Sequence, residues 1–380
     1  MNIGDGRSAM LLPMKLWLLL VYMILGCSIH LAAQMEDADA ATQNKCKQYS
    51  MTPLPGEAAQ TPQPKAWPDC NSYELYSGIS TKIDYAAARR CAWSERLAQQ
   101  ADLEPRYTIA SVFGGSAMLT VLYANGEGVD KNMPLALRFA CEASGAPAEI
   151  SYRLKDIESR SRKSAAEAAR FSFCDDITSG FMQGFCAAYF SELADASRTK
   201  SLISMAASMN QAQRQAFEQL NKLEQSYARA HADGEIDLSG TARAMFQIDA
   251  EDSLRHDFIS ALQSFEAGKF PTGATEAFQG ADARLNATYR HVMNRTEEHK
   301  NDYGAIQPEV IRSTERSWLK YRDAWLQFAK LRYPGVAPEV WLTLLTNDRA
   351  SVLDGSFCDM DAEDGPCAQK GDTWKPSPLP

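Results

Sequence analysis

Apolar side chains recur at helical spacing through most of this chain of 380 residues. The clearest stripe steps by three and four residues and consists of Ile311, Thr314, Trp318, Tyr321, Trp325 and Phe328. A stripe with this period lies on one face of a helix and packs against neighbouring helices. Similar stripes run from Met205 to Tyr227 and from Phe278 to Val292, and a last helix is expected from Pro338 to Val352. Strand-like alternation of any length is absent, so the pattern predicts an all-α fold.

Two shorter Ala-rich helices are expected upstream, at residues 84–100 and 133–144. The segment between them contains Gly126 and Gly128, and a tight turn between helices needs the positive φ that glycine adopts readily. The wider pattern consists of Ala117, Leu122, Tyr123, Gly126, Gly128-Val129, the helix Pro134 to Ala143, and Gly145. In these positions residues 115–147 resemble one Sel-like repeat, a bacterial relative of the tetratricopeptide helical hairpin.

A single repeat of this kind does not form a stable solenoid by itself. Asp84 to Cys91 resembles the second helix of an incomplete preceding repeat. Because about three repeats are needed to bury a continuous core, the rest of the chain or a disulfide must cap this one. Two interpretations stay open: a helical module that only packs, or a peptide-binding surface.

The first 33 residues are typical of a signal peptide. Lys15 precedes Leu16 to Leu25, an apolar run too short to span a bilayer. Ile24-Leu25-Gly26-Cys27 resembles a lipobox, in which the thiol of Cys27 is acylated. Leu31-Ala32-Ala33 instead offers ordinary cleavage before Gln34. We therefore expect a bacterial periplasmic protein, or an outer-membrane lipoprotein attached to the membrane only through its N-terminal lipid.

Two segments have the composition of irregular chain. Residues 34–69 are rich in Ala, Gln, Pro and Thr and are expected to form a flexible linker. The tail, residues 355–380, ends in Trp-Lys-Pro-Ser-Pro-Leu-Pro. The domains expected between them are a short Sel-like helical hairpin region at 70–150 and a disulfide-stapled helical bundle at 173–354.

Three blocks of residues appear in order along the second expected domain. They are Cys174-Asp175, Thr178, Met182 and Cys186-Ala187; then Ala281-Asp282, Leu285-Asn286 and Tyr289; and last Trp318 to Asp323, Thr346, Arg349 and Leu353. In these blocks residues 173–354 resemble the LprI-type lysozyme-inhibitor domain family, with a long additional helical stretch before the second block. The resemblance implies an exported helical domain whose partner is lysozyme, a cationic muramidase.

The cysteines predict four disulfides. Nine are present, and Cys27 is either acylated or removed with the signal. The other eight are Cys46, Cys70, Cys91, Cys141, Cys174, Cys186, Cys358 and Cys367. An even number in an exported chain favours disulfides, and the Cys-x-x-Cys pairs typical of a metal site are absent.

Two pairings follow from the resemblances. The LprI-type pattern implies a Cys174–Cys186 bond, which requires a break near Thr178-Ser179-Gly180, because twelve residues of continuous helix would separate the Cα atoms by about 18 Å. The stacking of Sel-like repeats implies a Cys91–Cys141 bond. Elimination then leaves Cys46 with Cys70, and Cys358 with Cys367.

Six positions in the family blocks are candidate binding residues: Asn286, Trp318, Tyr321, Arg322, Asp323 and Arg349. The aromatic ones have core spacing, and a ligand-stacking stripe is the alternative. The polar ones are interpreted as a buried network that fixes helix register, or else as a polar hot spot at the domain rim. Neighbouring residues on a helix point about 100° apart, so Arg322 and Asp323 are not expected to pair, and Arg349 is the expected partner of Asp323.

No pattern in the sequence is typical of catalysis, and we expect no enzymatic activity, cofactor or metal. The one candidate for acid–base catalysis is Glu235 with Asp237, as a glycosidase carboxylate pair. The local pattern instead favours a loop whose Ser239 or Thr241 caps the next helix. The formal charge of −9 disfavours nucleic acid and suits a cationic partner. Two functional classes remain: an inhibitor of a lysozyme-type muramidase, and an envelope scaffold or adaptor for another protein.

Overall fold

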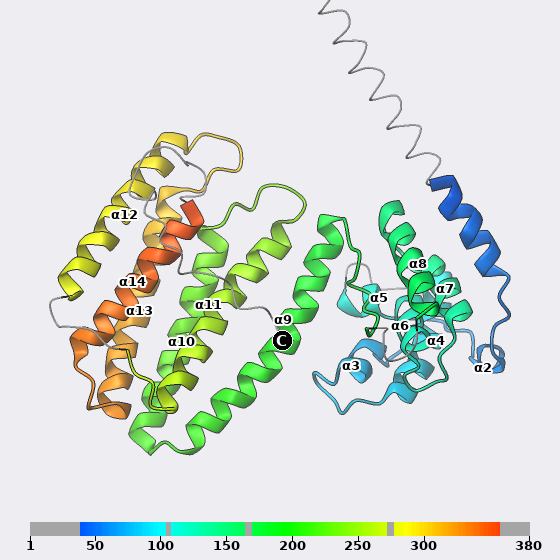
Figure 1. Cartoon of the computed structure of the whole chain (residues 1–380), viewed down its shortest axis with the longest axis horizontal. Coiled ribbons are helices and arrows are strands. Elements are labelled where there is room, and N and C mark those ends of the chain that lie inside the picture. Colours follow the sequence, from blue (N-terminus) through cyan, green and yellow to red (C-terminus); the bar gives the residue numbers. More distant parts are fainter. Residues whose placement is uncertain (1–38, 104–107, 164–168, 272–276, 358–380) are drawn as a thin grey trace, which may run out of the picture. The chain divides into compact units, whose positions relative to one another are not determined.

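The computed structural model describes residues 39–103, 108–163, 169–271 and 277–357 (Figure 1). Within these ranges the regular structure is helical throughout, which confirms the all-α prediction. The chain divides into two compact units with the boundary between Thr178 and Ser179. The predicted signal peptide, Cys27 and the cysteines of the tail, Cys358 and Cys367, lie outside the described residues.

The first unit is built from short helices. Residues 39–50 form a helix, and the helices that follow are α2 (Gly56–Gln60), α3 (Ser72–Ser77), α4 (Tyr85–Gln100), α5 (Ile109–Phe113), α6 (Ser116–Asn125), α7 (Met133–Glu142) and α8 (Pro147–Ser161). Helix α6 packs against α4 and α7, and α7 packs against α8. Because α6 is surrounded by other helices, nearly all of its side chains are buried, and its sequence is apolar on every side.

The turn between α6 and α7 has the expected glycine geometry. Gly126 and Gly128 have φ angles of 73° and 65°. A Cβ atom on Gly128 would lie 2.6 Å from the backbone carbonyl carbon of Tyr85, so this glycine also permits close approach of the start of α4. The helical hairpin at residues 115–147 is therefore present, and its assignment as a Sel-like repeat stays a proposal.

Two disulfides in the first unit differ from the expected pairings. Cys46 is bonded to Cys141, and Cys70 is bonded to Cys91. The predictions of Cys91–Cys141 and Cys46–Cys70 are therefore wrong. Stacking of α4 and α7 was expected to bring Cys91 to Cys141, but each cysteine faces a segment that the repeat pattern did not include.

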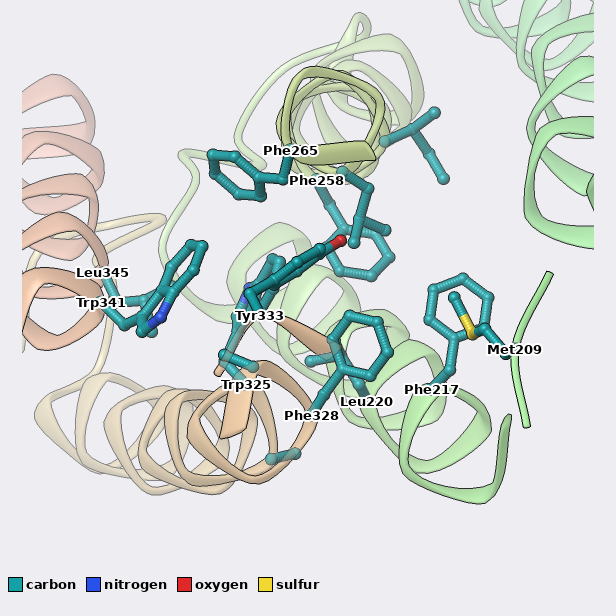
Figure 2. Close-up of a cluster of buried hydrophobic side chains, with 14 residues drawn as sticks. Met209, Phe217, Leu220, Phe258, Phe265, Trp325, Phe328, Tyr333, Trp341 and Leu345 are labelled. Atoms are coloured by element: carbon teal, nitrogen blue, oxygen red, sulfur yellow. The ribbon is translucent and has the colours of Figure 1, made fainter. Parts of the chain in front are cut away.

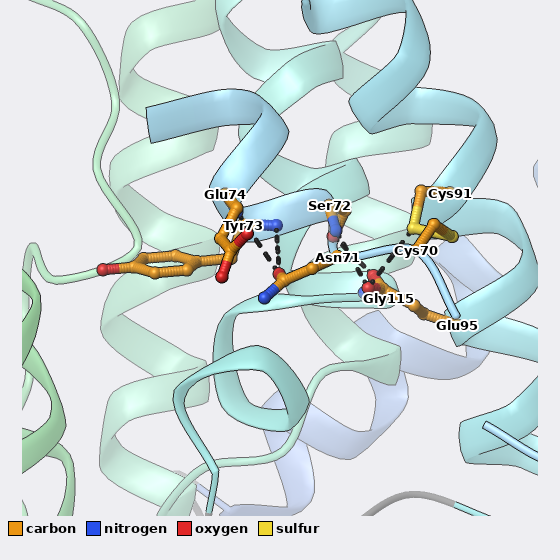
Figure 3. The surroundings of a disulfide bond; sticks show 8 residues. All are labelled: Cys70, Asn71, Ser72, Tyr73, Glu74, Cys91, Glu95 and Gly115. Carbon is orange, nitrogen blue, oxygen red and sulfur yellow. Dashed lines mark hydrogen bonds between the residues drawn. A yellow bond between two sulfur atoms is a disulfide. The ribbon is translucent and has the colours of Figure 1, made fainter. Parts of the chain in front are cut away.

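The environment of Cys91 shows why it faces the start of α3 (Figure 3). One turn along α4, the buried carboxylate of Glu95 accepts hydrogen bonds from the backbone N–H and the hydroxyl of Ser72. The same carboxylate accepts a hydrogen bond of 2.8 Å from the backbone N–H of Gly115, just before α6. This face of α4 therefore holds the starts of α3 and α6, and Cys70 lies just before α3.

The expected flexible linker at 34–69 is also corrected, over its described part. The helix at residues 39–50 is tied to α7 by the Cys46–Cys141 bond. Its Lys45 and Tyr49 both bind the carboxylate of Glu158 on α8, with N–O and O–O distances of 2.7 Å. A composition rich in Ala, Gln, Pro and Thr predicts a tether, but a disulfide and specific polar contacts hold the helix at residues 39–50 in place.

The second unit is a bundle of longer helices. They are α9 (Gly180–Ala207), α10 (Gln211–Gly234), α11 (Arg243–Glu266), α12 (Ala277–His299), α13 (Pro308–Arg332) and α14 (Pro338–Phe357). The pair α10 and α13 pack along each other, as do α9 with α11 and α12 with α14. Helix α11 also packs against α10, and α14 against α13, so α10 and α13 form the centre of the bundle.

An aromatic core joins four of these helices (Figure 2). The ring of Trp325 on α13 stacks on Trp341 of α14, with centroids 5.8 Å apart and an interplanar angle of 14°. Phe265 of α11 meets the ring of Trp341 edge-on at 5.0 Å, and Phe217 of α10 meets Phe328 of α13 at 5.3 Å. Offset and edge-on aromatic contacts add to the energy of burying apolar area, so this cluster holds α10, α11, α13 and α14 together.

The start of α9 has the predicted form, whereas its end does not. Ser179 caps α9 by accepting a hydrogen bond from the backbone N–H of Met182, so the chain breaks where a Cys174–Cys186 bond requires it. Both of these cysteines are disulfide-bonded. The stripe from Met205 to Tyr227 was expected to follow one helix, but α9 ends at Ala207 and a capping box at Asn210 starts α10.

We expect Gly180→Ala to destabilise the second unit by about 1–3 kcal/mol, as overpacking does. A Cβ atom there would lie 2.4 Å from the backbone carbonyl carbon of Thr241, and a backbone segment cannot move away as a flexible side chain can. The matched control is Gly280→Ala within α12, where a Cβ meets nothing within 4 Å. That control should gain about 0.5–1 kcal/mol, since alanine favours helix over glycine. Denaturant unfolding measures both, and an equal effect of the two changes would contradict the packing.

Candidate functional site

The second unit contains a fully buried ion pair, in which the side chains of Arg349 on α14 and of Glu235 are both 0% exposed. The guanidinium of Arg349 donates two parallel hydrogen bonds, of 2.8 and 2.7 Å, to the carboxylate of Glu235 at the end of α10. Its Nε donates a third, of 2.9 Å, to Glu315 on α13. The ring of Tyr227 lies against the guanidinium, with its centroid 5.6 Å from the central carbon. This bidentate arrangement is the strongest geometry available to an arginine and a carboxylate.

The carboxylate of Glu235 is satisfied from two sides. Besides Arg349, the Nδ1 atom of His231 lies 2.9 Å from its Oε2 atom, one turn earlier on α10. Burial alone would raise the pKa of Glu235, but Arg349 and then His231 hold it below its usual range. Burial likewise would lower the pKa of Arg349, but Tyr227, Glu235 and Glu315 keep it well above its ordinary value. The cluster is therefore an ionised, structural one.

Of the four polar candidates predicted from the sequence, only Arg349 lies in this buried cluster. Arg349 is buried, but its partners are Glu235 and Glu315, so the predicted Arg349–Asp323 pair is wrong. Asn286 is exposed and donates a hydrogen bond of 3.0 Å to Asp282 of its own helix. These polar family positions therefore do not form one network.

Arg322 and Asp323 form an ion pair with each other, which corrects the prediction that they cannot. The N–O distance is 2.8 Å, and the side chain of Asp323 is 58% exposed. The backbone directions do differ by about 100°, but the long arginine side chain crosses the ring of Trp318, 5.4 Å from its centroid, and reaches back. The contact forms because the arginine side chain is long enough to span the difference in direction between the two residues.

The aromatic candidates lie mainly in the core, as the spacing predicted. Trp318 and Trp325 are each 2% exposed. Tyr321 is half-buried, and its hydroxyl accepts a hydrogen bond of 2.7 Å from the indole N–H of Trp325. Its ring stacks on Tyr227, with centroids 5.6 Å apart. These contacts favour the core interpretation over a ligand-stacking stripe.

The suggested carboxylate pair Glu235 and Asp237 is not an acid–base pair. Glu235 is bound to Arg349, while Asp237 is exposed and accepts a hydrogen bond from the backbone N–H of Ser239. The expected capping of the next helix by Ser239 or Thr241 is also wrong, because α11 begins after Ala242 with no side-chain cap. The i,i+4 spacing of His231 and Glu235 was the one local signal of the buried cluster.

A second polar feature, which the sequence reasoning missed, is a pocket of about 220 Å³ between α9 and α11. Its lining residues, called here the acidic pocket, are Ser191, Asp195, Ile248, Glu251, Asp252 and Arg255. Asp195 accepts a hydrogen bond of 2.6 Å from Arg255, and Asp252 accepts one of 2.6 Å from Arg198 of α9. The signal in the sequence was the acid-to-base i,i+3 spacing of Asp195 with Arg198 and of Asp252 with Arg255.

Glu224 of α10 is a buried carboxylate and is 2% exposed. Neither of its carboxylate oxygens has a hydrogen-bond partner among the residues that the structure describes. Burial raises its pKa to about 7, against the attraction of Arg255 and Arg198. An ionised carboxylate in such a place is costly, so this group titrates near neutral pH.

We expect Glu235→Ala to cost about 3–5 kcal/mol of stability, because it leaves the buried guanidinium of Arg349 with Glu315 as its remaining carboxylate partner. Asp323→Ala is the control, since it breaks an ion pair whose carboxylate is mostly exposed. That change should cost less than about 1 kcal/mol. Denaturant unfolding of both variants measures the difference, and comparable losses would show that burial of the Arg349 cluster does not matter.

We expect Glu224→Gln to change how stability depends on pH. The folded-state pKa of Glu224, about 7, lies above its ordinary 4.5, so its favourable contribution is complete below pH 4.5 and is lost as pH rises through 7. A glutamine stays neutral and avoids that loss. The variant should therefore gain on the order of 2 kcal/mol over the parent at pH 8 and little at pH 4.5. Thermal unfolding at both values measures this, and a pH-independent difference would contradict the raised pKa.

Over the described ranges, no helix is long and apolar enough to cross a membrane. In the same ranges, no three His, Cys, Asp or Glu residues are grouped as metal ligands would be. No curated protein and no solved structure is detectably similar to the chain.

A family match covers the last three helices of the bundle. It begins at residue 272 and ends at residue 353, so it includes α12, α13, most of α14 and the blocks around Leu285, Trp318 and Arg349. The cysteine block at Cys174 and Cys186 lies outside it. The family is associated with bacterial extracytoplasmic proteins. The C-terminal half of the chain thus carries, over residues 272–353, a match to the family described as lysozyme inhibitor LprI.

Proposed function

We propose that this is an exported bacterial envelope protein that binds a lysozyme-type muramidase and inhibits it without catalysis of its own. The observation that carries the proposal is the match of residues 272–353 to the lysozyme inhibitor LprI family. An inhibitor of this kind requires a surface of fixed shape that occludes the enzyme, because rigidity in the bound conformation reduces the entropy lost on binding.

The packing of the matched helices supports this role. Helices α13 and α14 are held by the stacked rings of Trp325 and Trp341 and by the bonds from Arg349 to Glu315 and Glu235. A buried bidentate ion pair next to an aromatic cluster leaves few alternative arrangements of the backbone. The outer surface of α12, α13 and α14 is accordingly preorganised for a partner.

Charge and cysteine chemistry agree with the proposed partner and location. The formal net charge is −9, which favours encounter with a cationic enzyme. Six of the described cysteines are disulfide-bonded, as expected in an oxidising compartment outside the cytoplasm. Export by the predicted signal, with acylation of Cys27 or cleavage before Gln34, is part of this proposal.

A second candidate function is an envelope scaffold or adaptor. The specific observation in its favour is that residues outside the family match form a compact unit of their own, with the α6–α7 hairpin at its centre. We assign this hairpin to a Sel-like region at 70–150 and the bundle to an LprI-type region at 173–354. In the adaptor function the hairpin region, and not the bundle, would bind the partner.

The test is a turbidity assay in which the mature protein is titrated into a cationic lysozyme acting on bacterial cell walls. We expect the rate of clearing to fall to a plateau as the protein reaches the enzyme concentration. An unrelated acidic protein of similar net charge is the control for non-specific attraction. Clearing that continues unchanged at a large excess of the protein would reject the inhibitor function and leave the adaptor.

A further inference from the structure

A short segment of the first unit is held in place like a bound peptide. Residues 169–173, called here the internal peptide, lie between α8 and α9 and form no helix. Phe171 and Phe173 are 2% and 5% exposed, and Ser172 between them is half-buried. In a non-helical chain, side chains two positions apart can lie on the same face, as they do in a strand. The two rings are therefore the buried anchors of the segment.

The backbone of the internal peptide is bound by side chains. The carboxamide of Asn125, at the end of α6, accepts a hydrogen bond of 2.8 Å from the N–H of Phe171 and donates one of 3.0 Å to its carbonyl oxygen. Arg160 of α8 donates a further hydrogen bond to the carbonyl oxygen of Ala169. One side chain thus satisfies both backbone groups of Phe171, which in a helix or a sheet other backbone groups would satisfy. Such main-chain bonds give affinity for a linear segment without reading its sequence.

The two rings of the internal peptide meet partners that select aromatic side chains. The guanidinium of Arg153 on α8 lies over the ring of Phe173, 3.9 Å from its centroid, and Phe113 of α5 meets that ring edge-on at 6.2 Å. The guanidinium of Arg160 lies 5.6 Å from the centroid of Phe171. Cation–π and edge-on contacts both depend on the charge distribution of an aromatic ring. An aliphatic side chain at either position would lose them.

A basic side chain completes the pattern at the surface. Arg170 forms an ion pair of 2.7 Å with Glu127 of the α6–α7 turn and donates a hydrogen bond of 2.7 Å to the hydroxyl of Tyr76 on α3. The side chain of Arg170 is 56% exposed, whereas that of Glu127 is 17% exposed. The carboxylate therefore belongs to the site, and the arginine can exchange it for water at little cost.

We propose that the residues around the internal peptide are a docking site for a linear segment of a partner protein with the pattern basic–aromatic–small–aromatic. The contacts set this pattern: a cation for Glu127, a ring for Arg160, and a second ring for Arg153 two positions later. Aromatic and arginine side chains are also the commonest anchors at protein interfaces. The residues that form this site, called here the peptide site, are Tyr76, Phe113, Asn125, Glu127, Arg153 and Arg160.

The peptide site lies in the first unit, outside the family match at 272–353. The proposal deepens the adaptor function, because it names the kind of partner segment, and it rests on that function for the existence of a partner. In the absence of the partner, the internal peptide occupies the site. Its residues include no cysteine and no helix, so its release breaks neither a disulfide nor a helix within the segment.

Competition with the internal peptide makes the proposal testable. The apparent affinity for an external segment is the intrinsic affinity reduced by the fraction of molecules in which the internal peptide is detached. Substitutions that weaken the internal peptide should therefore strengthen external binding. A segment that serves only as a structural cap would instead detach only when the unit unfolds.

The probe is the internal peptide itself, acetyl-Ala-Arg-Phe-Ser-Phe-amide, titrated calorimetrically into the full mature protein. The control probe has alanine in place of both phenylalanines. We expect saturable binding of the first probe to the parent with a dissociation constant in the millimolar range, and no saturable binding of the control. Failure of the parent to bind the probe, or equal binding of the two probes, would identify the internal peptide as a structural cap and overturn the proposal.

Variants of the internal peptide should open the site to the probe. Phe171→Ala should bind it at least tenfold more tightly than the parent. Arg170→Ala should bind it at least threefold more tightly, and this exposed position keeps the test valid if Phe171→Ala alters folding. Adding Glu127→Gln to Arg170→Ala should abolish that gain, whereas the matched control Asp130→Asn, exposed near the same turn, should preserve it. Equal affinity of the parent and both opening variants would contradict competition.

Two further measurements separate this proposal from its alternatives. Light scattering tests the other possible occupant: dimers of the parent that are lost in Phe171→Ala would make a second copy of the chain the occupant and overturn the partner assignment. In the turbidity assay, unchanged clearing by a protein that does not bind the probe would reject the peptide site and leave the adaptor function to another surface. Inhibition together with selective probe binding would support the peptide site beside the inhibitor function.

Discussion

The buried contact of Arg349 with Glu235 fixes how the helices of the second unit pack together. Removing a guanidinium and a carboxylate from water costs several kcal/mol per ion, and only a close, fully bonded geometry returns that energy. The two parallel hydrogen bonds, the third bond to Glu315 and the ring of Tyr227 provide that geometry. Each of these groups comes from a different turn or helix, so α10, α13 and α14 can satisfy them in one register only.

This constraint connects the family match to the helices before it. Arg349 and Glu315 lie within residues 272–353, whereas Tyr227 and His231 lie on α10 and Glu235 directly follows it, all outside the match. The aromatic core repeats the division, since Trp325 and Trp341 lie inside the match and Phe217 and Phe265 outside it. The helices that lengthen the domain therefore complete the interior of the matched segment and are not an appendage to it. Two of these additional helices, α9 and α11, also line the acidic pocket. The helices outside the match therefore add both interior packing and exposed surface.

Sequence periodicity predicted the elements well because it depends on local geometry. The stripe from Ile311 to Phe328 and the glycines of the α6–α7 turn follow from rules that act over a few residues. The break before Gly180 instead follows from the Cys174–Cys186 bond that the family resemblance implies. The partners of buried charges could not be predicted this way. Arg349 and Glu235 are 114 residues apart, and no local pattern indicates which carboxylate enters the core.

The disulfides and the pocket show the same limit. Repeat stacking suggested Cys91 with Cys141, but Glu95 orients the α3 side of α4 towards the segment that contains Cys70. Asp323 was expected in the interior because its neighbours are, and it lies at the surface with Arg322. Glu224 sits in an apolar stripe where its charge gave no sign of burial. In each case, contacts with other helices determine which residue is buried or which residue it pairs with, and the local sequence does not show this.

Native-state hydrogen exchange of the second unit tests the central claim that the Arg349–Glu235 contact makes α10 and the family-matched helices one cooperative structure. Amides in the middle of α10, α13 and α14 should exchange through a common opening with the same free energy and the same denaturant dependence. The contradictory result would be protection of α13 and α14 that persists at denaturant concentrations where α10 already exchanges freely.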